Sequence, residues 1–310
     1  MSTAFLFPGQ GSQQPGMLHN LPRHPAVAET LDEASEALNE NILVWDSKEA
    51  LTSTVAVQVA LLVAGVAAAR ALVAEGAQPD MAAGHSVGAF GAAVAANVMH
   101  FRDAVTVVKR RGELMEKAYP QGYGMGVVVG IQERKLATIV EKHVTNDAPV
   151  FIANRNSPDQ ITISGSIRGI ERILALARKE GARKAELLKV KVPSHCRLLQ
   201  SVSAELAAAL KTIPFRRPDI PYAGNRTARA LLDPEAIRED LALGISHPVR
   251  WHEATSLLFE MGARLFIEMP PGRVLTDLAR QAFPEARAVS VSDSGIKTSS
   301  ILVKREKIME

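Results

Sequence analysis

A serine between two glycines is the feature of the sequence with the clearest chemistry. Gly84-His85-Ser86-Val87-Gly88 matches the Gly-x-Ser-x-Gly pattern of a nucleophile elbow, a sharp strand-to-helix turn that raises the serine hydroxyl above a sheet. Side chains at the two glycine positions would collide with the neighbouring strand and helix. The following helix would present free N–H groups where an oxyanion forms. The alternative is a glycine-rich packing turn with an inert serine.

A nucleophilic serine needs a base, and the chain contains eight histidines. His85 is next to the serine, but neighbouring side chains on a turn diverge, so we expect a structural role for it. His195 stands where a predicted inserted domain returns to the larger one, and clefts between domains are favoured places for a site. His195 is therefore the first candidate for the base, and His247 and His252 are the alternatives.

The elements that would position these residues alternate between strands and helices. Short buried strands are predicted for residues 3–7, 81–83, 220–222 and 264–268. Helices are predicted for residues 25–38, 55–75, 89–98, 101–118, 198–210, 251–261 and 274–282, and the charged tail 304–310 is expected to be frayed. This order predicts an α/β domain.

Residues 122–191 follow a different pattern. Strands at 127–131, 150–153, 160–164 and 184–190 alternate with helices at 133–144 and 167–180. The resulting order βαββαβ is typical of a ferredoxin-like unit. We therefore predict a small domain of residues 122–191 inserted into a discontinuous large domain of residues 1–121 and 192–310.

Composition restricts the classes of function. A length of 310 residues with 47% hydrophobic residues allows one large or two modest domains. The net charge of +3 is too weak to indicate a nucleic-acid partner. The single cysteine, Cys196, excludes an internal disulfide and fits a reducing compartment, so we expect a cytoplasmic protein. The uncharged stretch 51–69 is rich in alanine and contains polar residues, which favours a buried helix over a membrane span.

Several longer motifs stand in a characteristic order along the chain. They are Phe7-Pro8-Gly9-Gln10-Gly11-Ser12-Gln13, Gly84-His85-Ser86-Val87-Gly88, Arg111-Gly112, Asn156-Ser157-Pro158, Val192-Pro193-Ser194-His195, Pro248-Val249-Arg250-Trp251 and Pro271-Gly272-Arg273-Val274-Leu275. In this order they resemble the motifs of malonyl-CoA:acyl-carrier-protein transacylases, and the resemblance extends from residue 4 to about residue 291. The fold of that family is a hydrolase-like α/β domain with a ferredoxin-like insert, in agreement with the predicted strand order.

The resemblance implies roles for individual residues. Ser86 would be the nucleophile and His195 its general base, and the backbone amides of Gln10 and Val87 would form the oxyanion hole. Arg111 would hold the free carboxylate of the malonyl group, since a planar guanidinium can bind a carboxylate bidentately. Without the resemblance, Arg111 would be interpreted as a surface charge in the middle of a helix. Three further positions are implied to line the pocket, namely Gln58, Asn156 and Gln160.

Two departures from the family pattern bear on the prediction. The family often has a Gln whose main-chain carbonyl orients the catalytic histidine, and here that position is Gly244; a carbonyl is still present, so we expect the role to be kept. The elbow continues Val87-Gly88-Ala89-Phe90, where members that serve fatty-acid synthesis commonly have Leu-Gly-Glu-Tyr. This variant, with the ending 289–293, is similar to the transacylase (epsilon) subunit of bacterial malonate decarboxylase.

The activity implied is an acyl transfer. A malonyl group would move from malonyl-CoA, through a malonyl-serine ester, to the phosphopantetheine-type thiol arm of an acyl carrier protein. The carrier subunit of malonate decarboxylase is the first prediction for the acceptor, and the carrier of fatty-acid synthesis is the alternative. Neither a metal nor a prosthetic group is implied. The rival functions are a serine hydrolase that passes the acyl group to water and a non-catalytic docking module with the same fold.

Overall fold

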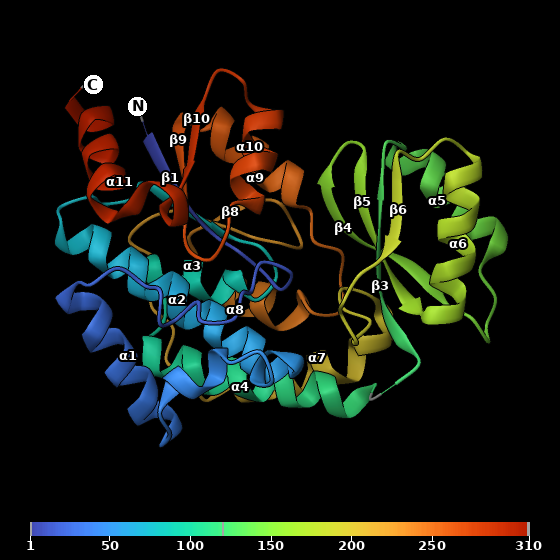
Figure 1. Ribbon diagram of the computed structural model, residues 1–310, viewed down its shortest axis with the longest axis horizontal. Coiled ribbons are helices and arrows are strands. Elements are labelled where there is room, and N and C mark those ends of the chain that lie inside the picture. Colours follow the sequence, from blue (N-terminus) through green and yellow to red (C-terminus); the bar gives the residue numbers. More distant parts are fainter. Residues whose placement is uncertain (1, 120, 309–310) are drawn as a thin grey trace.

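Two sheets of different kinds organise the chain (Figure 1), whose computed structural model describes residues 2–119 and 121–308. The larger sheet has the strand order β10-β9-β1-β2-β7-β8, and its neighbours pair in parallel except for the antiparallel pair β7–β8. Its strands are β1 (Ser2–Phe7), β2 (Met81–Gly84), β7 (Tyr222–Ala223), β8 (Ala230–Leu231), β9 (Ala263–Glu268) and β10 (Arg287–Ser290).

Helices cover both faces of this sheet, as the continuous buried run of its central strand β1 requires. Phe5 and Phe7 of β1 pack into one core with α1 (Pro25–Leu38), α2 (Thr54–Ala74), α3 (Gly88–Ala95), α4 (Phe101–Ala118), α7 (Gln200–Lys211), α8 (Pro234–Leu243) and α11 (Val291–Ile308). Ala4 and Leu6 point the other way, toward α9 (Trp251–Glu260) and α10 (Val274–Ala282). Short 3₁₀ turns lie at Ile42–Asp46, Ala50–Thr52 and Arg197–Leu199.

The apolar helix α2 lies in the middle of the larger core. By length and composition it could cross a membrane, but 89% of its most apolar window is buried inside the protein. It packs against α1, α3 and α4 and touches α11. The prediction of a buried core helix at this place is confirmed.

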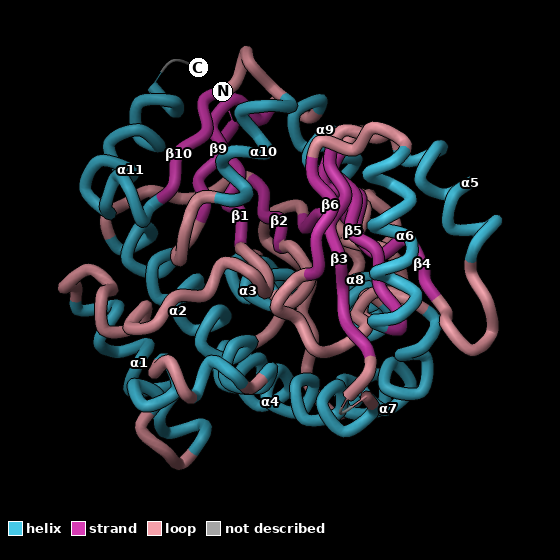
Figure 2. The backbone as a smooth tube through the Cα atoms, turned by 45° about the vertical axis from the view of Figure 1, so that its right-hand side comes forward, coloured by secondary structure: helices cyan, strands magenta, loops and turns pink. Residues whose placement is uncertain are grey.

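The second sheet contains β3 (Tyr123–Val129), β4 (Val150–Ser157), β5 (Gln160–Ser166) and β6 (Lys184–Leu187), in the order β4-β5-β3-β6. All of its neighbours are antiparallel. The helices α5 (Glu133–His143) and α6 (Ile167–Lys179) pack on its outer face and share a separate core with it (Figure 2). This is the ferredoxin-like arrangement, so the predicted fold class is confirmed.

The two sheets are joined by backbone hydrogen bonds. The Arg155 amide of β4 donates to the Val249 carbonyl at 2.8 Å, and the Val249 amide donates to the Ala153 carbonyl at 2.8 Å. Val249 belongs to the large domain and lies two residues before the start of α9. This short parallel bridge attaches the edge strand β4 of the small sheet to the large domain.

Several elements differ from the sequence prediction. The helix α8 and the strands β8 and β10 were not expected. The tail does not fray at residue 304, because α11 continues to Ile308 beyond a break at Gly295 and buries Val303 completely. A local signal for α8 is present. The side chain of Asp233 caps the helix by accepting hydrogen bonds from the amides of Glu235 and Ala236, and a proline follows at the first helical position.

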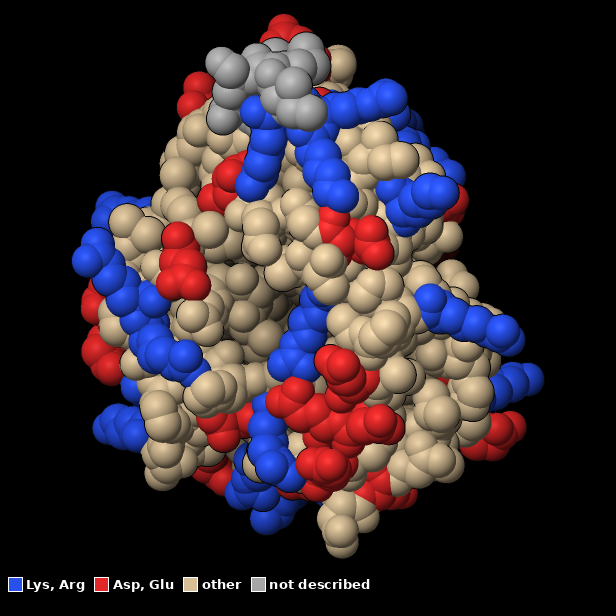
Figure 3. Space-filling model, turned by 90° about the vertical axis from the view of Figure 1, so that its left-hand side faces the viewer, with Lys and Arg blue, Asp and Glu red and all other residues tan. Residues whose placement is uncertain are grey.

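Charges are mixed on the face of the molecule that Figure 3 presents. Acidic side chains gather in one group beside a central hollow, and basic side chains lie on several sides of it.

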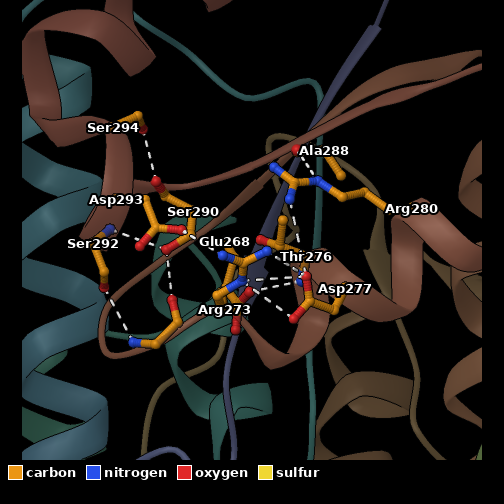
Figure 4. Close-up of polar contacts among 11 residues, drawn as sticks. Glu268, Arg273, Thr276, Asp277, Arg280, Ala288, Ser290, Ser292, Asp293 and Ser294 are labelled. Carbon is orange, nitrogen blue, oxygen red and sulfur yellow. Dashed lines mark hydrogen bonds and ion pairs between the residues drawn. The ribbon is translucent and has the colours of Figure 1, made fainter.

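A buried carboxylate organises the loop between β9 and α10 (Figure 4). Glu268 is fully buried and accepts hydrogen bonds from the backbone amides of Leu275 at 3.1 Å and Thr276 at 2.7 Å, in the first turn of α10. Burial raises the pKa of Glu268, and these amides lower it. Ser290 donates to the Gly272 carbonyl at 2.5 Å and ties β10 to the same loop.

We predict that Glu268→Gln destabilises the fold. The carboxamide leaves one of the two buried amides facing an NH₂ group, and an unpaired buried donor costs about 1–3 kcal/mol. Asp277→Asn is the matched control, because Asp277 lies in the same cluster but forms an exposed ion pair with Arg273 at 3.0 Å, and such pairs contribute about 0.2–1 kcal/mol. Urea denaturation of both variants measures the difference. Equal losses in the two variants would contradict the capping role.

Candidate active site

The serine stands on a tight turn between β2 and α3. Ser86 has φ 55°, a left-handed conformation that costs a non-glycine residue about 1–3 kcal/mol. A Cβ on Gly84 would lie 2.0 Å from the Gly88 carbonyl oxygen, and a Cβ on Gly88 would lie 2.1 Å from the Phe7 carbonyl oxygen. Both glycines are therefore required by close backbone approach, as the elbow pattern predicts.

His195 is hydrogen-bonded to this serine. Its Nε2 lies 2.7 Å from Ser86 Oγ, and its Nδ1 lies 2.7 Å from the Gly244 carbonyl oxygen. A carbonyl can only accept, so Nδ1 carries the proton and Nε2 is left to accept from the serine hydroxyl. His195 is 2% exposed and also has a positive φ, 63°. The structure thus places His195 where a general base must lie.

The other histidines named as candidates lie elsewhere. His85 Nε2 is 3.0 Å from Asn156 Oδ1, and its ring packs edge-on against Trp251. His247 bonds to the Leu243 carbonyl, and His252 is the second residue of α9. Of the described residues, His195 alone brings an imidazole into hydrogen-bond contact with Ser86.

Arg111 is buried beside the serine. It is 3% exposed, and its Nη2 lies 3.3 Å from Ser86 Oγ while its Nη1 donates to Gln58 Oε1. None of the described Asp and Glu side chains forms an ion pair with it. Burial lowers the pKa of Arg111 to about 10, so the guanidinium is still charged at neutral pH. The interpretation of Arg111 as a surface charge is wrong, whereas Arg110 does face solvent.

Close helix packing explains this burial. A Cβ on Gly112 would lie 2.7 Å from Val55 Cα, so α4 approaches α2 with little space between their backbones. That contact brings Arg111 of α4 against Gln58 of α2, whose Nε2 is 3.2 Å from Met115 Sδ. Gln58, Arg111, Ser86 and His195 line one cavity, and their catalytic and binding roles stay predictions.

The two residues predicted to form the oxyanion hole line the same cavity. They are Gln10 and Val87, and neither amide N–H is hydrogen-bonded to another described residue. The loop after β1 lies directly on the elbow, because a Cβ on Gly9 would be 2.6 Å from the His85 carbonyl oxygen. The two predicted oxyanion-hole residues are therefore brought to the serine by a glycine contact.

The small domain closes the cavity with residues that the sequence did not predict. Asn154 and Thr162, from β4 and β5, line it together with the serine and the arginine. The predicted residues Asn156 and Gln160 lie two positions nearer the turn of this hairpin, where Gln160 pairs with Ser157 and Asn156 contacts His85. Their contact with substrate stays a prediction. The Oδ1 atom of Asn154 is buried and has no hydrogen-bond partner among the described residues.

Burial dominates the electrostatics of the base. The pKa of His195 is lowered from 6.5 to about 3, first by burial and next by the positive charge of Arg111, while the Gly244 carbonyl raises it. The imidazole is therefore neutral in the free protein at physiological pH, as a base must be. Among the described residues, no group of three or more His, Cys, Asp or Glu side chains could hold a metal ion.

Comparison with known proteins gives the family. A family model described as the acyl transferase domain matches residues 4–302. The chain belongs to the acyl transferase family, among the malonyl-CoA:acyl-carrier-protein transacylases. The malonyl CoA-acyl carrier protein transacylases of Bacillus subtilis and Escherichia coli are 36% and 35% identical to it, over 94% and 96% of this chain and 93% and 98% of theirs.

Solved members of the family share the whole fold. The malonyl CoA-acyl carrier protein transacylase of Coxiella burnetii has a TM-score of 0.93 and 35% identity, and the match covers 98% of both chains. A malonyl-transacylase solved in complex with the acyl-carrier protein of a type II polyketide synthase has a TM-score of 0.92 and 35% identity, over 99% of this chain and 100% of that one. The predicted family is thereby confirmed.

We predict a pH-dependent loss of stability that comes from His195. Between pH 6.5 and about 3 the unfolded chain binds a proton on this imidazole and the folded chain does not, so stability falls as the pH falls through this window. His195→Gln removes this contribution, and its unfolding free energy should decline less steeply than that of the wild type between pH 6.5 and 4.5. Urea titrations at a series of pH values measure both slopes. Parallel slopes would show that His195 titrates normally.

Proposed function

We propose that this protein transfers malonyl groups from malonyl-CoA to the thiol of an acyl carrier protein. The observation that carries the proposal is the buried guanidinium of Arg111, which has no carboxylate partner among the described residues and touches the nucleophilic hydroxyl. A buried charge is expensive unless it is paired. The free carboxylate of a malonyl group supplies that partner, and its thioester carbon then lies next to Ser86.

The first half-reaction uses the hydrogen bonds of the site as they stand. His195 Nε2 takes the proton of Ser86 Oγ as the oxygen attacks the thioester carbonyl of malonyl-CoA. The amides of Gln10 and Val87 stabilise the oxyanion of the tetrahedral intermediate. When the intermediate collapses, His195 returns the proton to the departing thiolate of coenzyme A, and a malonyl-serine ester remains.

The second half-reaction reverses these steps with a new thiol. The phosphopantetheine-type arm of the carrier enters, His195 accepts its proton, and the thiolate attacks the serine ester. The same two amides hold the second oxyanion, and each such donor contributes on the order of 10²–10³ in rate. Collapse releases malonyl-carrier and restores the hydroxyl of Ser86. The cycle needs no metal or prosthetic group, and we place it in the cytoplasm.

The carrier of fatty-acid synthesis is the better supported acceptor. The curated relatives in Bacillus subtilis and Escherichia coli are malonyl CoA-acyl carrier protein transacylases, and a solved relative binds an acyl-carrier protein of a type II polyketide synthase. The carrier of malonate decarboxylase remains a second prediction, which rests on Val87, Ala89 and Phe90 at the elbow. A side-by-side transfer assay with both carriers decides between them.

The hydrolase alternative is less well supported by the site. The elbow, the base and the oxyanion donors serve hydrolysis equally well, but a buried cation beside the serine is not required for it. Release of coenzyme A that is equally fast with and without carrier would identify a hydrolase. A transferase stalls at the serine ester until the thiol arrives.

We expect Ser86→Ala to abolish the covalent intermediate. Wild-type protein mixed with malonyl-CoA should gain the mass of one malonyl group, because the ester persists without a carrier. The variant lacks the attacking oxygen and should show no adduct by intact-protein mass spectrometry. Ser35→Ala is the control, since Ser35 bonds to the Leu31 carbonyl within α1 and should leave labelling unchanged. An adduct on Ser86→Ala would place the nucleophile elsewhere.

Replacing Arg111 should relax the choice of acyl group. Hydrogen bonds to a charged partner contribute about 1.5–3 kcal/mol, so Arg111→Ala should lower the preference for malonyl-CoA over acetyl-CoA at least about tenfold. Arg110→Ala is the matched control, because Arg110 is exposed and pairs only weakly with Glu113 and Glu205. A competition assay with both thioesters measures the ratio. An unchanged ratio in Arg111→Ala removes this residue from carboxylate recognition.

A further inference from the structure

One asparagine outside the catalytic pair bridges the nucleophile turn. The Oδ1 atom of Asn225 accepts a hydrogen bond from the Ser86 amide at 3.0 Å, and its Nδ2 donates to the Gly84 carbonyl at 2.7 Å. Its side chain is 5% exposed, so water does not compete for these bonds. A single carboxamide thereby connects both sides of the turn on which the serine stands.

This turn needs such a bridge. Ser86 has φ 55°, which the chain adopts only when surrounding contacts impose it. The Ser86 amide precedes α3 and has no helical acceptor, and the Gly84 carbonyl is at the end of β2. Asn and Gln side chains can donate and accept at once, whereas an aspartate can only accept. Asn225 matches both requirements of the turn.

The asparagine is itself fixed by a buried carboxylate of α8. Asp240 is 2% exposed, and its Oδ2 accepts from the Asn225 amide at 3.0 Å and from the Tyr222 hydroxyl at 3.0 Å. The Asn225 carbonyl in turn accepts from the Arg250 amide at 2.9 Å. The backbone of Asn225 is therefore held on both sides.

The same helix also holds the base. The Gly244 amide donates to the Asp240 carbonyl at 2.8 Å, and the Gly244 carbonyl accepts from His195 Nδ1 at 2.7 Å. The C-terminal turn of α8 thus contacts the histidine through Gly244 and the serine turn through Asp240 and Asn225. One rigid element sets the positions of both catalytic groups.

We infer that Asn225 is a positioning residue for the nucleophile, which fixes the conformation of Ser86 so that its hydroxyl meets His195. The inference rests on the proposed serine chemistry but not on the malonyl specificity. Loss of the bridge should slow every reaction of Ser86 and leave the binding of the acyl carboxylate at Arg111 unchanged.

The test compares two substitutions of Asn225 with a neighbouring control. Asn225→Ala removes both hydrogen bonds, and Asn225→Asp keeps the size and the acceptor but places an oxygen against the Gly84 carbonyl. Tyr222→Phe is the control, because it removes a hydrogen bond from Asp240 and keeps the bridge intact. Each variant is first checked for folding by circular dichroism and thermal unfolding.

The first measurement is the rate at which a fluorophosphonate probe labels Ser86. A misplaced catalytic group costs on the order of 10–100-fold in rate, and we expect a loss of this size in both Asn225 variants and wild-type labelling in Tyr222→Phe. The second measurement is malonyl transfer, in which kcat should fall while KM for malonyl-CoA stays the same. If Asn225→Ala does not fold, Asn225→Asp carries the test.

Two results overturn the inference: wild-type labelling in a folded Asn225 variant, or an equal loss of labelling in Tyr222→Phe. The second result would mean that general stability, and not the bridge, governs reactivity. The probe does not require malonyl recognition. A wild-type protein that reacts with the probe but not with malonyl-CoA would therefore refute the proposed function and still test Asn225.

Discussion

In the proposed mechanism, the reactivity of Ser86 depends on the hydrogen bond between His195 Nδ1 and the Gly244 carbonyl. This bond fixes the tautomer, and through it the direction of proton transfer at Nε2. A backbone carbonyl does this without a negative charge. An aspartate in its place would have offset the positive charge of Arg111 a short distance away. The neutral acceptor leaves that charge available to an incoming anion, so the orientation of the base and the recognition of the acyl group do not compete.

The local parts of this site could be predicted, and the tertiary parts could not. The elbow consists of consecutive residues, so the spacing of Gly84, Ser86 and Gly88 is enough to predict it. The burial of Arg111 depends on how closely α4 packs on α2, which sequence periodicity does not report. The helix α8 is not predicted although Asp233 marks its start, because its ten residues span too few turns to show a clear amphipathic period.

The small domain illustrates the same limit. The sequence predicts its succession of strands and helices, βαββαβ, and the structure agrees with it. Which residues of that hairpin reach the serine depends on where β4 meets Val249 of the large domain. This register places Asn154 and Thr162 in the cavity, two positions from the residues that the family resemblance suggested. Strand identity is a local property, but register against another domain is not.

The proximity of Arg111 to His195 lowers the basicity of the imidazole. In the free protein, burial and the nearby guanidinium together lower the pKa of His195 and make it a poor proton acceptor. A carboxylate that neutralises the guanidinium removes the second of these causes, so the pKa of His195 should rise when an acid-bearing thioester is bound, while burial still holds it below its ordinary value. In the proposed mechanism the acyl carboxylate would therefore increase the basicity of His195 as well as anchor the substrate.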